Sequence, residues 1–439
     1  MTELPGGWRL ASLSELGTWT GGGTPSKGTV AFWNGDIPWV SPKDMKVMRI
    51  RDTEDHITDA AVAGSSTCLV PRGAVLVVTR SGILRHTFPV AVADRKVAIN
   101  QDLKALLPHP GLVPEYVAWS LRAHAPRILS SCSKSGTTVQ SIETTKLLDF
   151  AIPIAPASEQ RRIVEAIEEQ FSRLDNAEKL LGRVLRSLEV LRAHVLATAF
   201  VGDWPWTTIG EIADIVGGVT KDAKRQSDPS FVEVPYLRVA NVQRGSLDLT
   251  TVTTIRVPPE KARALELRVG DVLFNEGGDR DKLGRGWIWS GEIEGCIHQN
   301  HVFRARLRDD FEPKFVSLHG NIFGRRWFEE RGRQTTNLAS LNLKTLKSFP
   351  VPAPLLDEQR EIVSELERRL SLIDALANEV RQAMSRSAAL RRSILECAFT
   401  GKLAPQDPSD EPASMLLERI AARRIPARKP SRSRRKVPA

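Results

Sequence analysis

Cysteine is scarce in this chain. The 439 residues contain four cysteines, Cys68, Cys132, Cys296 and Cys397, which lie far apart and form no Cys-x-x-Cys pair. This spacing argues against a disulfide framework and against a zinc site. We therefore expect no bound metal and a reducing compartment.

Long apolar runs are also missing. No stretch approaches the length of a membrane span, and the opening residues MTELPGGWRL lack the basic and apolar regions of a secretory signal. With 41% hydrophobic and 26% charged residues, the composition is that of a globular protein. The length predicts two or more domains. We expect no membrane contact and a cytoplasmic location.

Acidic residues are absent from the last part of the chain. The segment AARRIPARKPSRSRRKVPA (421–439) carries eight of the Lys and Arg residues that give the chain its net charge of +10. The remainder is nearly neutral, so any DNA binding by the folded part must come from local patches. The segment itself is either a basic arm that touches phosphates or a solvated tail.

An internal repeat dominates the rest of the sequence. Aligning residues 150–202 with residues 349–401 without gaps gives 16 identities in 53 positions, including the matched strings EQR (from Glu159) and EQR (from Glu358). Weaker similarities continue upstream, where DIPWVSPKDM from Asp36 resembles EVPYLRVANV from Glu233. A duplicated unit, a globular part followed by a helical part, is indicated.

The helical parts carry apolar residues at spacings of three and four over roughly 40 residues, with Ser158 and Asp357 as expected N-caps. Each helix would be about 60 Å long. A domain of about 150 residues has a radius of gyration near 15 Å, too small to return the chain to a parallel start. The two helices are therefore predicted to pair antiparallel as a coiled coil.

The globular parts show short apolar runs bounded by Gly, Pro, Asn and Asp, which predict an α/β fold with many loops. The fold class expected is thus two tandem α/β domains separated by two long helices, with a pseudo-twofold repeat. The predicted divisions are domain one at 1–150, a helical region at 151–202, domain two at 203–349, a second helical region at 350–403, and a helix with a basic disordered tail at 404–439.

These motifs resemble the specificity subunits of type I restriction-modification enzymes. The resemblance covers essentially the whole chain, from W-x-L, GGGTPSK and DIPWVSPKDM to the paired P-x-P...EQR-x-IV entries at Pro153–Val164 and Pro352–Val363. The second domain departs from the pattern, because it has GGVTKDA where the first has GGGTPSK.

The resemblance implies a non-catalytic subunit that chooses the DNA sequence for a larger complex. Each recognition domain would read one half of a bipartite, asymmetric target in double-stranded DNA, and the helix pair would set the spacing. Two methylation (M) subunits and restriction (R) subunits would dock on it. S-adenosylmethionine, ATP and Mg²⁺ are expected in those partners, and no cofactor is expected on this chain.

Loops rich in Gly, Ser, Lys and Arg are the candidate DNA contacts, since phosphate contacts give register and base-edge contacts give sequence choice. For each loop the alternative is a turn built from turn-forming residues, in which glycine supplies a positive φ. Asn100-Gln101-Asp102 and His298-Gln299-Asn300 are further candidates, or else amides that complete a backbone network. The predicted DNA-binding residues are Gly22, Gly23, Thr24, Ser26, Lys27, Ser41, Lys43, Arg80, Ser81, Gly218, Lys221, Arg238, Asn241, Gly278, Arg280 and Lys282.

Enzyme signatures are not found. GGGTPSK is a poor Walker A loop, because Ser26 stands where a glycine is required and Pro25 removes an amide that should bind phosphate. No Asn-Pro-Pro-Tyr or Asp-Pro-Pro-Tyr segment is present, so we expect no catalytic residue. Two alternatives stay open: a coiled-coil adaptor without base preference, and a specificity module of a methylation-only or other DNA-modification complex.

Overall fold

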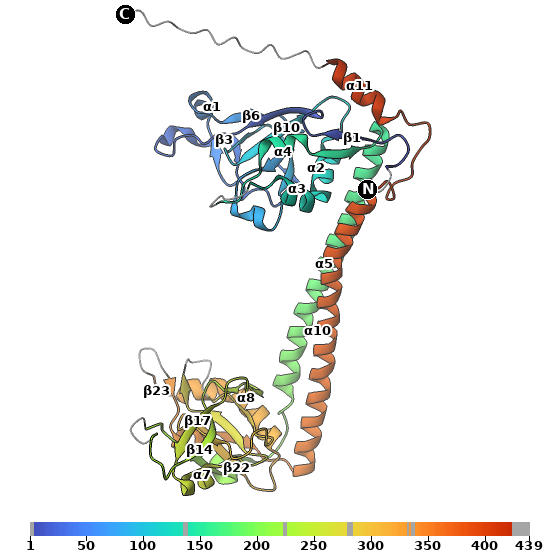
Figure 1. Cartoon of the computed structure of the whole chain (residues 1–439). Coiled ribbons are helices and arrows are strands. Elements are labelled where there is room, and N and C mark those ends of the chain that lie inside the picture. The colour runs from blue at the N-terminus through green and yellow to red at the C-terminus, as the bar shows by residue number, and fades with distance from the viewer. Residues whose placement is uncertain are drawn as a thin grey trace, which may run out of the picture. The chain divides into compact units, whose positions relative to one another are not determined.

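The computed structural model describes residues 4–134, 139–222, 226–278, 284–331, 333–334 and 339–423. The chain divides into two compact units, Met1–Leu181 with Gln382–Ala439, and Gly182–Arg381. Each unit holds one α/β domain and a part of each long helix (Figure 1). We call the domains head 1 (residues 4–156) and head 2 (residues 203–355), and the two long helices the stalk helices.

The elements of head 1 and the first stalk helix are, in chain order, β1 (Arg9–Ser12), β2 (Gly17–Gly21), η1 (Val30–Phe32), β3 (Trp33–Val40), β4 (Arg49–Ile50), β5 (His56–Ile57), α1 (Asp59–Gly64), β6 (Cys68–Val70), β7 (Val75–Val78), η2 (Gly82–Arg85), β8 (Val90–Ala93), β9 (Val97–Ile99), β10 (Leu103–Pro108), α2 (Pro114–Ala123), α3 (Ala125–Cys132), α4 (Thr144–Asp149), β11 (Ala151–Ile154) and α5 (Ala157–Thr198).

Head 2 and the remaining helices follow as β12 (Trp206–Thr208), α6 (Ile209–Ile212), β13 (Ala213–Gly217), β14 (Val232–Leu237), β15 (Val242–Gln243), β16 (Ser246–Leu247), β17 (Thr253–Val257), α7 (Pro259–Leu265), β18 (Val272–Asn275), β19 (Gly277–Gly278), β20 (Gly286–Ile288), β21 (Ile297–His298), β22 (Val302–Leu307), α8 (Pro313–Arg331), β23 (Arg333–Gln334), β24 (Ala339–Ser340), α9 (Leu343–Lys347), β25 (Pro350–Pro352), α10 (Leu356–Phe399) and α11 (Ala413–Arg423).

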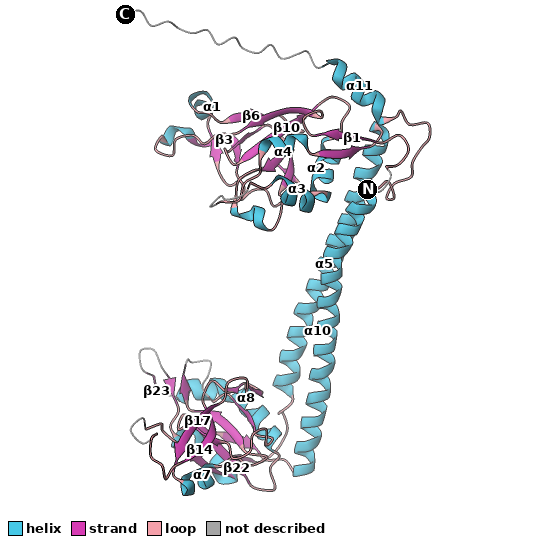
Figure 2. Ribbon diagram, in the orientation of Figure 1, coloured by secondary structure: helices cyan, strands magenta, loops and turns pink. Residues whose placement is uncertain are grey.

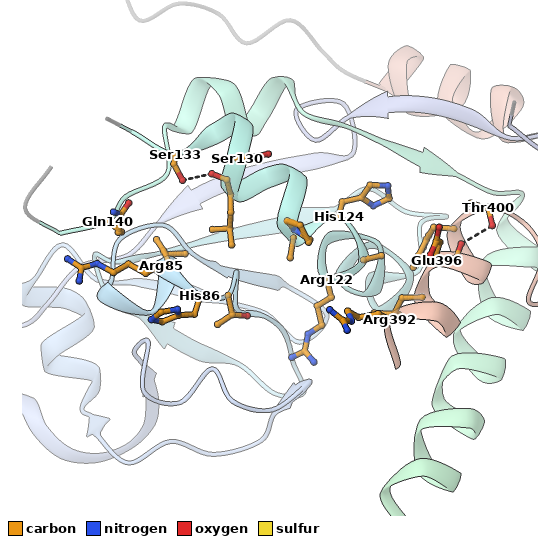
Figure 3. Close-up of a pocket in the computed structure, with 18 residues that line it drawn as sticks. Arg85, His86, Arg122, His124, Ser130, Ser133, Gln140, Arg392, Glu396 and Thr400 are labelled. Carbon is orange, nitrogen blue, oxygen red and sulfur yellow. Dashed lines mark hydrogen bonds between the residues drawn. The ribbon is translucent and has the colours of Figure 1, made fainter. Parts of the chain in front are cut away.

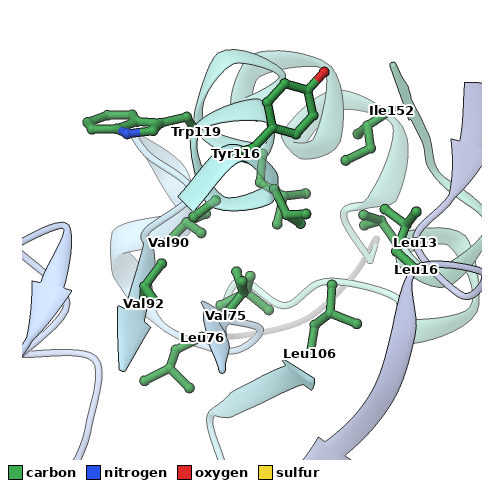
Figure 4. Packing of buried hydrophobic residues seen from close by; sticks show 14 of the residues in the cluster. Leu13, Leu16, Val75, Leu76, Val90, Val92, Leu106, Tyr116, Trp119 and Ile152 are labelled. Atoms are coloured by element: carbon green, nitrogen blue, oxygen red, sulfur yellow. The ribbon is translucent and has the colours of Figure 1, made fainter. Parts of the chain in front are cut away.

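Head 1 is built on a five-stranded sheet of order β2-β10-β7-β8-β4 and a four-stranded sheet of order β5-β3-β9-β6. All four residues of β7 and of β8 are buried, as the unbroken apolar runs of these strands require. Helix α2 packs Tyr116 and Trp119 toward them, with Leu106 and Ile152 in the same cluster (Figure 4). The core of head 1 therefore lies between its main sheet and α2.

Head 2 repeats this plan. Strand β22 pairs antiparallel with β13 and β18, as β10 does with β2 and β7 in head 1. Strand β14 pairs parallel with β21, as β3 does with β9. In both heads a proline begins the helix that follows this central strand: Pro114 begins α2 after β10, and Pro313 begins α8 after β22. Duplication of sequence thus corresponds to duplication of fold (Figure 2).

The stalk helices pair in opposite directions. In the first unit Asp175 of α5 accepts a hydrogen bond from Arg391 of α10 at 2.6 Å, and in the second unit Arg192 of α5 pairs with Asp374 of α10. Because these residues occupy matched positions of the repeat, the same ion pair is made twice. A parallel pairing in register would place aspartate against aspartate and arginine against arginine, so charge favours the antiparallel arrangement.

The predicted fold class, with two α/β domains, two long antiparallel helices and an internal repeat, is confirmed. The expected N-caps are wrong. Helix α5 begins at Ala157 and helix α10 at Leu356, so Ser158 and Asp357 lie inside the first turn rather than before it. Ser158 instead donates to Asp410, which precedes α11. Among the described residues, no helix is long and apolar enough to cross a membrane.

Candidate nucleic-acid interface

Three predicted loops of head 1 meet at the turn formed by Asn100–Asp102. The Gly23 amide donates to the Ile99 carbonyl at 3.0 Å, and Thr24 contacts the Gln101 side chain. The Thr79 amide donates to the Asp102 carbonyl at 2.8 Å, and Arg80 Nε donates to Asp102 Oδ1 at 2.6 Å. The Asn100 amide donates to Val40 at the end of β3, so the Ser41–Asp44 loop joins the same cluster.

Head 2 places the corresponding loops around the turn His298–His301. The Val219 amide donates to the His298 carbonyl at 2.9 Å, and the Gln299 amide donates to the Leu237 carbonyl at 2.8 Å. The Glu276 amide donates to the His301 carbonyl at 2.9 Å, as Thr79 does to Asp102 in head 1. The two heads therefore carry one backbone framework with different side chains on it.

The loops after β3 and β14 have matched local geometry. Ser41 donates from both its amide and its hydroxyl to Asp44 Oδ2 at 2.8 Å, and the Arg238 amide donates to Asn241 Oδ1 at 2.8 Å. Asn241 is 2% exposed and also donates to the carbonyls of Asp248 and Thr251. The side chains of Ser41 and Asn241 thus shape their loops and are occupied within the fold.

The cationic candidates differ in their surroundings. Lys43 is exposed and lies 3.0 Å from carboxylate oxygens of both Glu54 and Asp55, whose hydrogen bonds raise the pKa of its ammonium. Lys27 and Lys221 are exposed on the loops that follow the glycines of each head. The predicted contacts Arg280 and Lys282 lie outside the described residues, and Gly278 is described as part of β19.

The alternative explanation for the glycines, a turn that needs a positive φ, does not hold at Gly22, Gly23 and Gly218, none of which has a positive φ. A Cβ at Gly22 would lie 2.5 Å from the Ile99 carbonyl carbon, and one at Gly218 would lie 2.5 Å from that of His298. Close approach of two backbones, rather than a left-handed conformation, excludes a side chain here. Ser26, Lys27, Arg80 and Ser81 remain at the accessible side of this framework.

Two histidines of head 2 have structural surroundings. Burial lowers the pKa of His298 to about 4, and its Nδ1 lies 2.6 Å from the Val302 carbonyl oxygen, which it bonds as a donor. His301 Nδ1 lies 2.6 Å from Glu276 Oε2. No group of three or more His, Cys, Asp or Glu side chains gathers as a metal site among the residues that the structure describes.

An open cleft lies beside each head where it meets the stalk. In the first unit a cleft of about 1000 Å³ is bordered by Arg85, His86, His124 and the end of α10 at Arg392 (Figure 3). In the second unit a cleft of about 1000 Å³ is bordered by α8, by Arg192 and Leu196 of α5, and by Leu370 of α10. Positions 392 and 395 of the first cleft correspond in the repeat to positions 193 and 196 of the second.

The turns Asn100–Asp102 and His298–His301 were given too little weight in the prediction from the sequence. Asn100 Oδ1 accepts from the Asp102 amide at 3.0 Å, which matches the alternative of an amide that completes a backbone network. The available signal was the recurrence of a polar tripeptide at nearly the offset of the repeat, at 100–102 and 298–300. Their place at the centre of three loops depends on contacts between residues as far apart as Thr24 and Gln101.

Comparison with known proteins agrees with this architecture. Residues 5–184 match the family model of the type I restriction modification DNA specificity domain. The specificity subunit of the type I restriction enzyme StySPI from Salmonella potsdam is 24% identical, with 99% of both chains covered. That of EcoR124I/EcoR124II from Escherichia coli is 42% identical over 38% of this chain and 41% of the relative.

Solved structures share the fold. The HsdS subunit from Thermoanaerobacter tengcongensis has a TM-score of 0.65 at 19% identity, covering 91% of this chain and 98% of that one. A chain from a structure of type I R-M system assembly has a TM-score of 0.67 at 21% identity, covering 91% and 100%. The chain thus shares the fold of these solved structures, and its residues 5–184 match the type I restriction modification DNA specificity domain. Over its whole length it is similar to specificity subunits of type I restriction enzymes.

Proposed function

We propose that each head reads one half of a bipartite, asymmetric target in double-stranded DNA. The observation that carries this proposal is the loop cluster built twice on one backbone framework, around Asn100–Asp102 and around His298–His301. Unlike side chains on like frameworks suit two different half-sites. The antiparallel stalk helices are then the element that sets the number of base pairs between the halves.

Arg80 is the first residue that we assign to base or phosphate contact in head 1. Its Nε is bonded to Asp102, which orients the guanidinium, and the two terminal amino groups are the donors that a guanine edge accepts in the major groove. Lys27 and Lys221 are assigned to phosphates, because they are exposed on the glycine loops of head 1 and head 2. Arg280 and Lys282 are kept as candidates from the sequence.

The partners that we propose are two methylation subunits and the restriction subunits of the same system. Equivalent clefts beside head 1 and head 2, each about 1000 Å³, suit two copies of one partner. The chain itself is proposed to be non-catalytic. S-adenosylmethionine, ATP and Mg²⁺ act in the partners, and the methylation subunits turn the target adenine out of the duplex.

Two measurements test this function. Mapping methylated adenines in the host genome, with and without this gene, is expected to reveal one motif with two separated halves that disappears when the gene is deleted. In binding assays with the purified complex, inserting one base pair between the halves rotates one half-site by about 34° and moves it by about 3.4 Å, so binding is expected to be lost. Sequence-independent binding would support the adaptor alternative instead. Methylation without cleavage would indicate a methylation-only complex.

A further inference from the structure

A buried glutamine lies in the first turn of each stalk helix. Gln160 and Gln359 are both 0% exposed, and they are the central residues of the two EQR strings. Gln160 Nε2 donates to the Ala155 carbonyl at 2.8 Å, and Gln359 Nε2 donates to the Pro354 carbonyl at 2.9 Å. Each amide thus holds the turn that connects the last strand of a head to its stalk helix.

The carbonyl oxygen of each glutamine reaches into the head. Gln160 Oε1 accepts from the Val113 amide at 3.0 Å, and Val113 is the N-cap of α2. Gln359 Oε1 accepts from the Glu312 amide at 2.9 Å, immediately before α8 begins at Pro313. The first amides of a helix have no partner within it, so each glutamine supplies an acceptor that water cannot supply at a buried junction.

The residue before each glutamine forms a second connection. Glu159 Oε2 accepts from the Trp8 indole at 3.0 Å, and Glu358 Oε1 accepts from the Trp204 indole at 2.8 Å. In the repeat Trp8 and Trp204 occupy matched positions, because Leu10 and Trp206, two residues further on, pair with the matched prolines Pro153 and Pro352. The same bond between tryptophan and glutamate is therefore made in both units.

A third connection uses matched positions with different charges. In the first unit Arg49 bridges Glu115 of α2 and Glu168 of α5. In the second unit the residue matching Glu115 is Lys314, which pairs directly with Glu367 at 2.6 Å. The head and the stalk helix are thus joined at the same place by a bridging arginine in one unit and by a direct ion pair in the other, whereas the glutamine is the same in both.

We propose that Gln160 and Gln359 are positioning residues that set the angle of each head on its stalk helix. Only a side chain with both a donor and an acceptor at this length can hold the connecting turn and the head helix together. If the amide is lost, two buried backbone groups are left unpaired, and the head gains orientations in which water reaches them. The consequence for DNA spacing rests on the function proposed above.

A distance measurement in the full-length chain tests the positioning role without DNA. Spin labels at Lys96→Cys in head 1 and Leu180→Cys on α5, both exposed and in one unit, report the angle, with Cys68 and Cys397 replaced by serine. Gln160→Met keeps the side-chain volume and removes both hydrogen bonds, so a broader distance distribution is expected. Glu165→Gln, exposed one turn further along α5, is the matched control and should leave the distribution narrow.

Rescue separates positioning from general destabilisation. Gln160→Glu keeps the acceptor, and when protonated it also regains a donor, so the distribution should narrow as the pH falls toward 4 while Gln160→Met stays broad. A Gln160→Met distribution as narrow as wild type would overturn the proposal. So would a broad distribution for Gln160→Glu that does not respond to pH.

A second experiment measures DNA binding by the complex of this chain with its partner subunits. Gln160→Met and Gln359→Met should each lower discrimination against targets with one added base pair by about tenfold, while the base preference within each half-site is unchanged. If wild type shows no discrimination by spacing, the proposed function fails and the label result still decides the positioning role. If wild type discriminates and both variants discriminate equally well, the positioning role is refuted and the proposed function stands.

Discussion

The adjacent glycines of each loop cluster permit a decisive comparison. A Cβ added at Gly218 would lie 2.5 Å from the His298 carbonyl carbon and 2.6 Å from the Gln299 carbonyl oxygen, whereas at Gly217 the nearest atom would be 3.8 Å away. The His298 carbonyl oxygen would lie closer still, so Gly218→Ala must push β21 and its turn away by more than about 1 Å, since ordinary contacts begin near 3.4 Å. Gly217→Ala makes only ordinary van der Waals contacts, at 3.8 Å or more, and should be tolerated.

The expected cost follows from the contacts that the shift disrupts. The Val219 amide bonds the His298 carbonyl at 2.9 Å and the Asn300 amide bonds the Val219 carbonyl at 3.0 Å, and both span the moving interface. Overpacking costs about 1 to 3 kcal/mol, and each hydrogen bond contributes about 0.5 to 1.5 kcal/mol. A loss of about 3 kcal/mol in the free energy of opening head 2 is therefore expected for Gly218→Ala.

Hydrogen exchange of the full-length chain measures this loss locally. A change of 3 kcal/mol corresponds to about 100-fold faster exchange at the amides of Val219 and Asn300, provided that exchange occurs from the opened state. Gly217→Ala should exchange like wild type. In head 1, Gly22→Ala and Gly21→Ala repeat the comparison, because a Cβ at Gly21 would have only Lys104 Nζ near it, at 3.9 Å. A Gly218→Ala protein with wild-type exchange but without DNA binding would refute the packing argument and favour a direct DNA contact.

Three further predictions concern the stalk, a buried acid and a candidate contact. Arg192→Asp should lower the free energy of unfolding in urea by about 1 kcal/mol, because the introduced carboxylate would repel Asp374. Adding Asp374→Arg should restore the stability. A double variant without this recovery would contradict the ion pair. Burial raises the pKa of Glu159, so its stabilising contribution is full below its ordinary pKa and is lost as the pH rises through the raised value; Glu159→Gln should therefore flatten the decline in melting temperature between the ordinary and the raised pKa, and an unchanged pH profile would refute this effect of Glu159. Arg80→Ala should weaken DNA binding by about tenfold or more with little change in melting temperature, since Arg80 is 56% exposed; equal affinity in fluorescence anisotropy would remove it from the interface.

The repeat made the architecture predictable from the sequence. Matched positions such as Asp175 and Asp374 implied two like helices, and the short link between the first helix and the second head implied opposite directions. The apolar run 74–78 was read as a strand, and strand β7 spans Val75–Val78. These features are local or periodic, so spacing along the chain carries them.

The loop clusters were only partly predictable. Loops rich in Gly, Ser, Lys and Arg could be identified, but Ser41 and Asn241 were ranked with Arg80 because composition does not reveal which side chain is occupied within the fold. Gly22 and Gly218 remain predicted DNA contacts, but the positive φ that was the alternative explanation for them is absent. A positive φ is a local property, whereas their role depends on a backbone that approaches from a distant segment.

The sequence by itself determined two α/β heads, two long helices and their opposite directions, because periodicity and link length constrain them without knowledge of packing. Only the tertiary structure decided that the candidate loops meet at Asn100–Asp102 and His298–His301, and that Gln160 and Gln359 join each head to its helix. These contacts connect residues 22 positions apart or more. Such pairings form when the sheets pack and the core closes, and no local preference of either partner specifies the other.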